Sequence, residues 1–153
     1  KVTVAVQRFG NVGSIGADLL HKEGCRIVAA SDVSGAYYNP NGLPIRRMIE
    51  HAKTTKHNTL EGFDSPGVTK ITNEELLELD VDILVPAALE KQITLKNAEK
   101  IKAKAIIEGA NGPTTPEAER ILFKKKKVIV AIKPRRTVAA PLLLAFRTAS
   151  LLN

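Results

Sequence analysis

The chain has 153 residues, of which 44% are hydrophobic, 25% are charged and one, Cys25, is a cysteine. This composition is typical of one soluble globular domain, and the uncharged apolar runs are far shorter than the roughly 20 residues of a transmembrane helix. The composition therefore excludes a membrane protein and a disulfide-stabilised secreted scaffold, and we expect a cytoplasmic protein in which Cys25 is a buried free thiol.

The net charge of +7 is distributed unevenly along the chain. Residues 1–119 carry 14 basic and 16 acidic side chains, whereas residues 120–153 carry 9 basic side chains and no acidic one. A basic tail of this kind can bind nucleic acid, but lysine runs such as residues 124–127 more often form a solvated surface. We therefore expect no nucleic acid among the partners.

Strand and helix patterns alternate along the chain. Continuous apolar runs predict buried strands at residues 2–6, 26–31, 82–85, 105–107 and 128–132. Helical spacing and start signals predict helices after Gly10, over residues 45–56, after a capping box that begins at Thr72, over residues 95–101 and from Pro116. Turns and loop are expected at residues 37–44 and 57–68. This order predicts a doubly wound, mostly parallel sheet with helices on both faces, a Rossmann-like α/β fold.

A glycine-rich turn links the first predicted strand to the first predicted helix. Gly10 would let the backbone come close to a pyrophosphate, and Gly13 would let the helix pack tightly on the strand. Asp32 ends the next strand, where a carboxylate can accept hydrogen bonds from an adenosine ribose and would repel a 2′-phosphate. The alternative is that Asp32 caps the turn near Ser34. The pattern favours NAD over NADP as the cofactor.

Arg8 stands where the G-x-G-x-x-G pattern has its first glycine. If the turn forces this residue towards positive φ, an L-residue there costs on the order of 1 kcal/mol. The guanidinium could pair with a pyrophosphate oxygen, or it could fill the space that the adenosine needs. We expect obstruction to prevail, because the turn is crowded.

Several longer stretches resemble one known family. They are residues 81–90, 101–104 and 108–118, together with Ser31-Asp32 and residues 38–42. These stretches look like the cofactor-binding domain of glutamate dehydrogenase, in the Glu/Leu/Phe/Val dehydrogenase family, and residues 108–118 are the most specific of them. The resemblance covers residues 1–130, which we expect to be an NAD-binding Rossmann domain. Residues 131–153 depart from the family pattern and are expected to form a basic and apolar, helical segment.

The resemblance implies a cofactor role for particular residues. Gly10, Asn11, Val12 and Gly13 would hold the pyrophosphate, and Asp32 and Val33 would lie at the adenosine ribose. The wall beside the middle of the cofactor would consist of Pro86, Ala87 and Ala88. Asn111 would reach the nicotinamide-side ribose, unless it is only a turn asparagine. The three histidines have no partners at metal-ligand spacing, so we expect no metal site.

The implied activity of the parent protein is the oxidative deamination of glutamate to 2-oxoglutarate and ammonia, by hydride transfer to NAD. The family's substrate domain, with its catalytic lysines, is not found in this sequence, so we expect the chain alone to be inactive and to contain no catalytic residue. Family resemblance also implies a homo-oligomer, often a hexamer. The alternative is a non-catalytic, truncated or altered Rossmann module whose basic tail binds partners. The departure after residue 130 could reflect a shifted reading frame, a replaced exon or an uncertain sequence.

Overall fold

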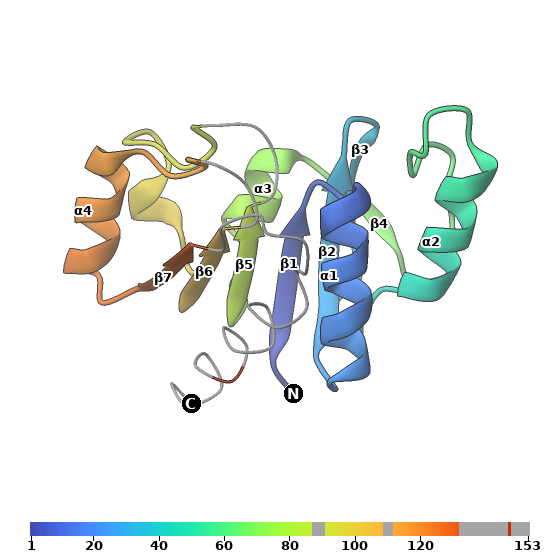
Figure 1. The fold of residues 1–153 in the computed structure, drawn as a ribbon, viewed down its shortest axis with the longest axis horizontal. Helices are drawn as coiled ribbons and strands as arrows, with labels where there is room; N and C mark the ends of the chain where they lie inside the picture. Colours follow the sequence, from blue (N-terminus) through green and yellow to red (C-terminus); the bar gives the residue numbers. More distant parts are fainter. Residues whose placement is uncertain (87–90, 109–111, 132–146, 148–153) are drawn as a thin grey trace.

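The structure is a computed structural model, and it describes residues 1–86, 91–108, 112–131 and 147. In this part of the chain seven strands form one sheet in the order β4-β3-β2-β1-β5-β6-β7 (Figure 1). Their bounds are β1 Thr3–Gln7, β2 Arg26–Asp32, β3 Gly35–Tyr38, β4 Thr69–Ile71, β5 Ile83–Pro86, β6 Ala105–Glu108 and β7 Val128–Ala131. The pairs β2–β1, β1–β5, β5–β6 and β6–β7 are parallel. The pairs β2–β3 and β3–β4 are antiparallel. The prediction of a mostly parallel sheet is confirmed.

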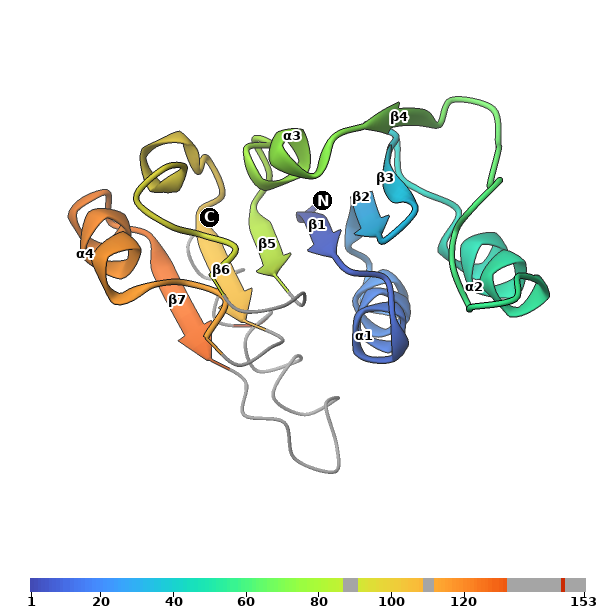
Figure 2. The same cartoon turned by 90° about the horizontal axis from the view of Figure 1, so that it is seen from above.

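Helices cover both faces of this sheet. Their bounds are α1 Asn11–Lys22, α2 Ile45–Thr54, α3 Asn73–Leu77 and α4 Pro116–Lys124, with a 3₁₀ turn η1 at Ala98–Lys100. Figure 2 shows α1 and α2 on one side of the sheet and α3 and α4 on the other. The doubly wound α/β fold expected from the sequence is therefore present. None of the helices in the described residues is long and apolar enough to cross a bilayer.

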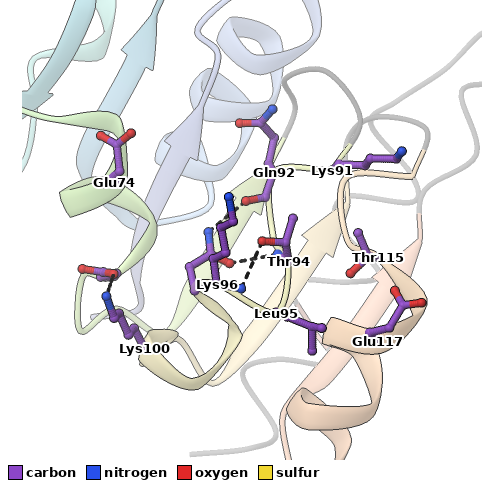
Figure 3. A pocket seen from close by; sticks show the side chains of 11 residues that line it. Glu74, Lys91, Gln92, Thr94, Leu95, Lys96, Lys100, Thr115 and Glu117 are labelled. Carbon is purple, nitrogen blue, oxygen red and sulfur yellow. Dashed lines mark hydrogen bonds and ion pairs between the residues drawn. The ribbon is translucent and has the colours of Figure 1, made fainter.

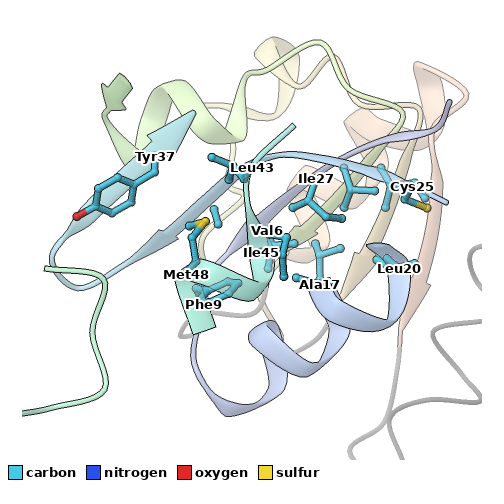
Figure 4. Packing of buried hydrophobic residues seen from close by; sticks show 14 of the residues in the cluster. Val6, Phe9, Ala17, Leu20, Cys25, Ile27, Tyr37, Leu43, Ile45 and Met48 are labelled. Carbon is cyan, nitrogen blue, oxygen red and sulfur yellow. The ribbon is translucent and has the colours of Figure 1, made fainter. Parts of the chain in front are cut away.

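Two hydrophobic layers hold the helices on the sheet, because successive strand residues point to opposite faces. Val4 and Val6 belong to the layer under α1 and α2, in which Leu20 and Met48 are fully buried. Figure 4 shows Val6 in this layer. Ala5, between Val4 and Val6, belongs to the layer under α3 and α4. Burying a side chain the size of leucine or methionine stabilises the folded state by roughly 1.5 to 3 kcal/mol relative to leaving it exposed. The continuous apolar strands in the sequence thus reflect a sheet that is buried on both faces. Cys25 is also buried, as expected, and burial raises the pKa of its thiol to about 11.

The predicted helix starts at Thr72 and Pro116 are confirmed. The Thr72 hydroxyl accepts a hydrogen bond from the Glu75 amide, while the Thr72 amide donates to the Glu75 carboxylate, which completes a capping box. At α4 the Thr115 hydroxyl accepts from the Ala118 amide, and Pro116 occupies the first helical turn. Local side-chain hydrogen bonds therefore mark where these two helices begin.

Two predictions about local structure are wrong. The turn-rich residues 37–44 begin inside a strand, because β3 folds back on β2 and buries Ala36 and Tyr37, so that the turn region starts only at Asn39. The helix expected over residues 95–101 is reduced to η1. The side chain of Asn97 explains this second difference, since it accepts from the Thr94 amide and donates to the carbonyl of Gln92, in competition with helical bonding.

Candidate functional site

The turn between β1 and α1 lies at the carboxyl edge of the parallel strands. Arg8 directly follows β1 and has φ 68°, the glycine-like conformation that its place in the sequence predicts. Its amide donates to the Ser31 hydroxyl at 3.3 Å, and the next amide, that of Phe9, donates to the Ser31 carbonyl at 2.5 Å. The turn is thus fastened to the end of β2.

The packing of the fold requires a glycine at only one of the two glycine positions of the turn. A β-carbon on Gly13 would overlap the carbonyl oxygen of Arg8, so the contact of α1 with the turn leaves no room for a side chain. A β-carbon on Gly10 would meet only the Arg8 side chain, at 3.8 Å, and Gly10 has φ −96°, which any residue adopts. The fold therefore requires Gly13, whereas a side chain at Gly10 would meet only the flexible side chain of Arg8.

The first turn of α1 has the properties of an anion site. It contains the predicted residues Asn11, Val12 and Gly13, and the N-cap residue Gly10 provides no side-chain hydrogen bond. The first amides of an α-helix have no intrahelical acceptor, and the helix dipole adds partial positive charge there. Backbone amides beside an open glycine are the arrangement that binds a pyrophosphate in this class of fold.

Asp32 ends β2 next to this turn. One carboxylate oxygen accepts from the Ser34 amide at 2.8 Å, and the other accepts from the Leu60 amide at 2.6 Å. Asp32 therefore caps the turn before β3, which is the alternative that the sequence left open, and it also ties down the loop after α2. The Ser34 hydroxyl donates to the same carboxylate at 2.5 Å. Of the about four acceptor positions of a carboxylate, roughly one therefore remains for a ribose hydroxyl. The adjacent Val33 side chain is 90% exposed.

A groove of about 360 Å³ brings several of these residues together. Its lining residues are Gln7, Arg8, Ser31, Asp32, Val33, Asn73 and Gln92. Gly10 lies instead in a separate hollow of about 220 Å³, with Phe9 and Ser14. The predicted ribose residues Asp32 and Val33 thus share one cavity with Arg8, whereas the predicted pyrophosphate residue Gly10 lines another.

Sequence reasoning missed a cluster of amide side chains in this groove. The Gln7 side-chain amide donates to the Gln92 oxygen at 2.8 Å and to the Asn73 oxygen at 3.2 Å. The Gln7 side chain is 2% exposed, and its own oxygen has no hydrogen-bond partner. A glutamine at the end of an apolar strand is a signal that could have identified Gln7. Its partners lie 66 and 85 positions away, and no local pattern indicates them.

The remaining predicted residues follow β5 and β6. Pro86 is the last residue of β5 and is buried, while Ala87, Ala88 and Asn111 lie outside the described residues. Glu108 ends β6, is 7% exposed, and has one carboxylate oxygen without a hydrogen-bond partner. Burial raises the pKa of this carboxyl, and the nearby Glu119 carboxylate raises it further. Because β1, β2, β5 and β6 are parallel neighbours, their carboxyl ends meet at one edge of the sheet.

A second groove, of about 750 Å³, lies on the α3 and α4 side of the sheet (Figure 3). Its charges balance, since three acids and three lysines line it: Glu74, Glu78, Glu117, Lys91, Lys96 and Lys100. Lys100 pairs with Glu78 at 3.9 Å. Such a surface favours neither an anion nor a cation. Within the described residues, no three His, Cys, Asp or Glu side chains are grouped so that they could hold a metal ion.

Comparison with known proteins finds relatives in one family of dehydrogenases. The family model of the Glutamate/Leucine/Phenylalanine/Valine dehydrogenases matches residues 1–134. A glutamate dehydrogenase of Thermotoga maritima is 55% identical over 131 residues, which are 85% of this chain and 30% of that protein. An NADP-specific glutamate dehydrogenase of Synechocystis is 46% identical over 130 residues, covering 80% of this chain and 30% of that protein.

Solved structures show the same likeness. The hetero-hexameric glutamate dehydrogenase of Thermus thermophilus superposes with a TM-score of 0.72 at 30% identity, over 98% of this chain and 33% of that one. The chain thus spans about 30% of the length of the curated relatives that it matches. It belongs to the Glutamate/Leucine/Phenylalanine/Valine dehydrogenase family.

Proposed function

We propose that residues 1–130 form the nicotinamide-dinucleotide-binding domain of a glutamate dehydrogenase. The observation that carries this proposal is the turn at the carboxyl edge of β1 and β2, where Gly10 lines a hollow although the packing of the fold does not require a glycine there. That hollow lies at the uncapped first turn of α1, and Arg8 of the same turn lines the groove of Asp32. Ligands of open α/β sheets bind at this edge.

Each part of the site would hold a different part of the cofactor. The first amides of α1, including that of Gly13, would donate to the pyrophosphate, and Gly10 would let it approach the backbone. The remaining acceptor position of Asp32 would accept from a ribose hydroxyl, and the exposed Val33 side chain would lie against the adenosine. Ala87, Ala88 and Asn111, which follow the neighbouring strands, are proposed for the nicotinamide half. When bound, the cofactor supplies hydride transfer, and the chain supplies position and electrostatics.

We propose NAD as the cofactor, because the Asp32 carboxylate at the ribose repels a 2′-phosphate. Glutamate is the proposed substrate of the whole protein, since the similar chains from Thermotoga maritima and Synechocystis are named glutamate dehydrogenases. An oligomer is proposed from the hetero-hexameric Thermus thermophilus protein. Oxidative deamination and assembly are thus proposals for the parent protein.

Calorimetric titration of the 153-residue chain with NAD tests this function. We expect saturable binding, and we expect Gly10→Ala to weaken it at least tenfold while the melting temperature changes little, because the added methyl group meets only a flexible side chain. No binding of NAD or NADP by the unaltered chain would contradict the proposal. Equal affinity of the Gly10→Ala variant would show that the cofactor does not approach this turn.

A further inference from the structure

The turn between α4 and β7 brings two lysine side chains onto the segment that precedes β6. The Lys125 ammonium group donates to the carbonyl of Glu99 at 2.5 Å and to that of Ile101 at 3.2 Å. The Lys127 ammonium group donates to the carbonyl of Lys102 at 3.1 Å. Both groups are therefore held against one short stretch of backbone. This stretch lies at the amino edge of the sheet, opposite the carboxyl edge at which the turn after β1 lies (Figure 1).

Carboxylates neutralise this lysine cluster only in part. Among the described residues, neither Lys125 nor Lys127 makes an ion pair with a carboxylate. A third lysine of the cluster, Lys104, pairs with Asp82 at 3.2 Å. Asp80 favours the charged form of Lys127, but Lys125 and Lys104 both oppose it. Positive charge thus prevails around the Lys127 amine.

Lys127 has the surroundings of an activated amine. Burial lowers the pKa of its ammonium group below the ordinary value of 10.5, and repulsion from Lys125 lowers it further. A lysine that is partly desolvated, or that lies beside another cation, is a better nucleophile near neutral pH because more of it is uncharged. Lys127 is only partly buried, so a small reagent can reach it. The neighbouring ammonium groups would attract a reagent that carries negative charge.

We propose that Lys127 is a site of covalent acylation by acyl phosphates, with Lys125 and Lys104 drawing the phosphate group towards it. The uncharged amine of Lys127 attacks the carbonyl carbon of the donor and forms a C–N bond, while the bond from that carbon to the phosphate oxygen breaks. Inorganic phosphate leaves with the electron pair of the broken bond, and the nitrogen loses a proton to solvent. The product is an amide, so one of three crowded positive charges is removed.

Incubation of the 153-residue chain with acetyl phosphate near neutral pH tests the site. Cleavage after glutamate releases residues 120–153 as one peptide and residues 51–61 as another. Fragmentation of these peptides in a mass spectrometer then compares Lys127 with Lys56, an exposed lysine that follows α2. We expect acetylation of Lys127 to be faster by about threefold or more. In urea, where the fold is lost, the two lysines should react alike.

Two substitutions separate the cluster from the lysine run in which it lies. Lys125→Gln removes the neighbouring charge and should slow acetylation of Lys127 by about twofold or more, without changing the rate at Lys56. Lys124→Gln is the matched control, because Lys124 is an exposed lysine at the end of α4 that donates to none of the three carbonyls, and it should change neither rate. An uncharged acetyl ester should prefer Lys127 less strongly than acetyl phosphate does.

Three outcomes would overturn the proposal. Equal rates at Lys127 and Lys56 in the folded chain would show that Lys127 is an ordinary surface lysine. Equal slowing by Lys125→Gln and Lys124→Gln would show that the contacts of Lys125 do not select Lys127. An acetyl ester with the same preference as acetyl phosphate would show that the cluster does not attract the phosphate group, and acyl phosphates would no longer be the assigned donor.

Discussion

The carbonyl oxygen of Arg8 occupies the space into which a side chain at position 13 would project, so the first turn of α1 packs directly on the turn after β1. The carbonyl carbon of Arg8 would be the next contact, at 3.1 Å, followed by the Val6 side chain at 3.4 Å. This close approach holds the amides of α1 at the carboxyl edge of the sheet, and it makes the geometry of the site depend on one missing methyl group.

Gly13→Ala should therefore destabilise the fold. The methyl group would meet backbone, which cannot rotate away, and overpacking of this kind costs about 1 to 3 kcal/mol. Urea unfolding measures the loss. Gly10→Ala is the matched control, because its methyl group would make only an ordinary contact, and it should cost less than about 1 kcal/mol. Equal losses in the two variants would contradict the packing seen at Gly13.

Arg8→Gly should stabilise the chain by about 1 kcal/mol, because glycine adopts φ 68° without the steric penalty of an L-residue. Scanning calorimetry would show a higher melting temperature. Arg8→Ala separates the backbone effect from the side chain, since alanine keeps the penalty and should give no such gain. A gain of the same size in both variants would instead assign the effect to the arginine side chain.

Asp32→Ser should alter both cofactor preference and stability. Removing the carboxylate removes the charge that repels a 2′-phosphate, so the ratio of the Kd for NADP to that for NAD should fall. Loss of the bond from the Leu60 amide should also cost roughly 1 to 3 kcal/mol, because a partly buried donor is left unpaired. Asp64→Ser, at an exposed loop position, is the control. Unchanged relative affinities would exclude Asp32 as the ribose ligand.

Glu108 should make stability fall as the pH rises. Burial raises the pKa of its carboxyl in the folded state above the ordinary value of 4.5, so the folded chain holds this proton more tightly than the unfolded chain does. The resulting stabilisation is complete below about pH 4.5 and is lost as the pH rises through the folded-state pKa. Glu108→Gln should therefore gain stability relative to the unaltered chain between pH 4.5 and neutrality. Unfolding curves at several pH values measure this. A difference in unfolding free energy between Glu108→Gln and the unaltered chain that stays constant with pH would contradict the prediction.

Much of the fold could be predicted because local chemistry determines it. The apolar runs of β1, β2, β5 and β6 identify a sheet buried on both faces, and the caps at Thr72 and Thr115 identify helix starts. β3 could not be predicted in this way, since its residues form a strand only because β2 offers them a pairing edge. The helix predicted over residues 95–101 does not form, because helix propensity does not take account of the side-chain hydrogen bonds that Asn97 makes.

The candidate site was predictable only in part. The glycine spacing and the position of Asp32 after a strand indicate the turn and the ribose side from sequence alone. The hydrogen bond from the Leu60 amide to Asp32 joins segments that are distant in the sequence, and so does the bond from Gln7 to Gln92. Contacts of this kind depend on the tertiary fold, so no periodicity in the sequence reports them.

The central position of β1 affects how the chain can fold as it is synthesised. β1 pairs with β2 on one side and with β5 on the other, and the Thr3 amide donates to the carboxylate of Asp82, 79 positions along the chain. A ribosome completes β1 and β2 long before it releases β5. Until then the nascent chain exposes an apolar strand with one unpaired edge, which can pair with other chains. The strand at the centre of the finished sheet thus keeps one edge unpaired until β5 has been synthesised.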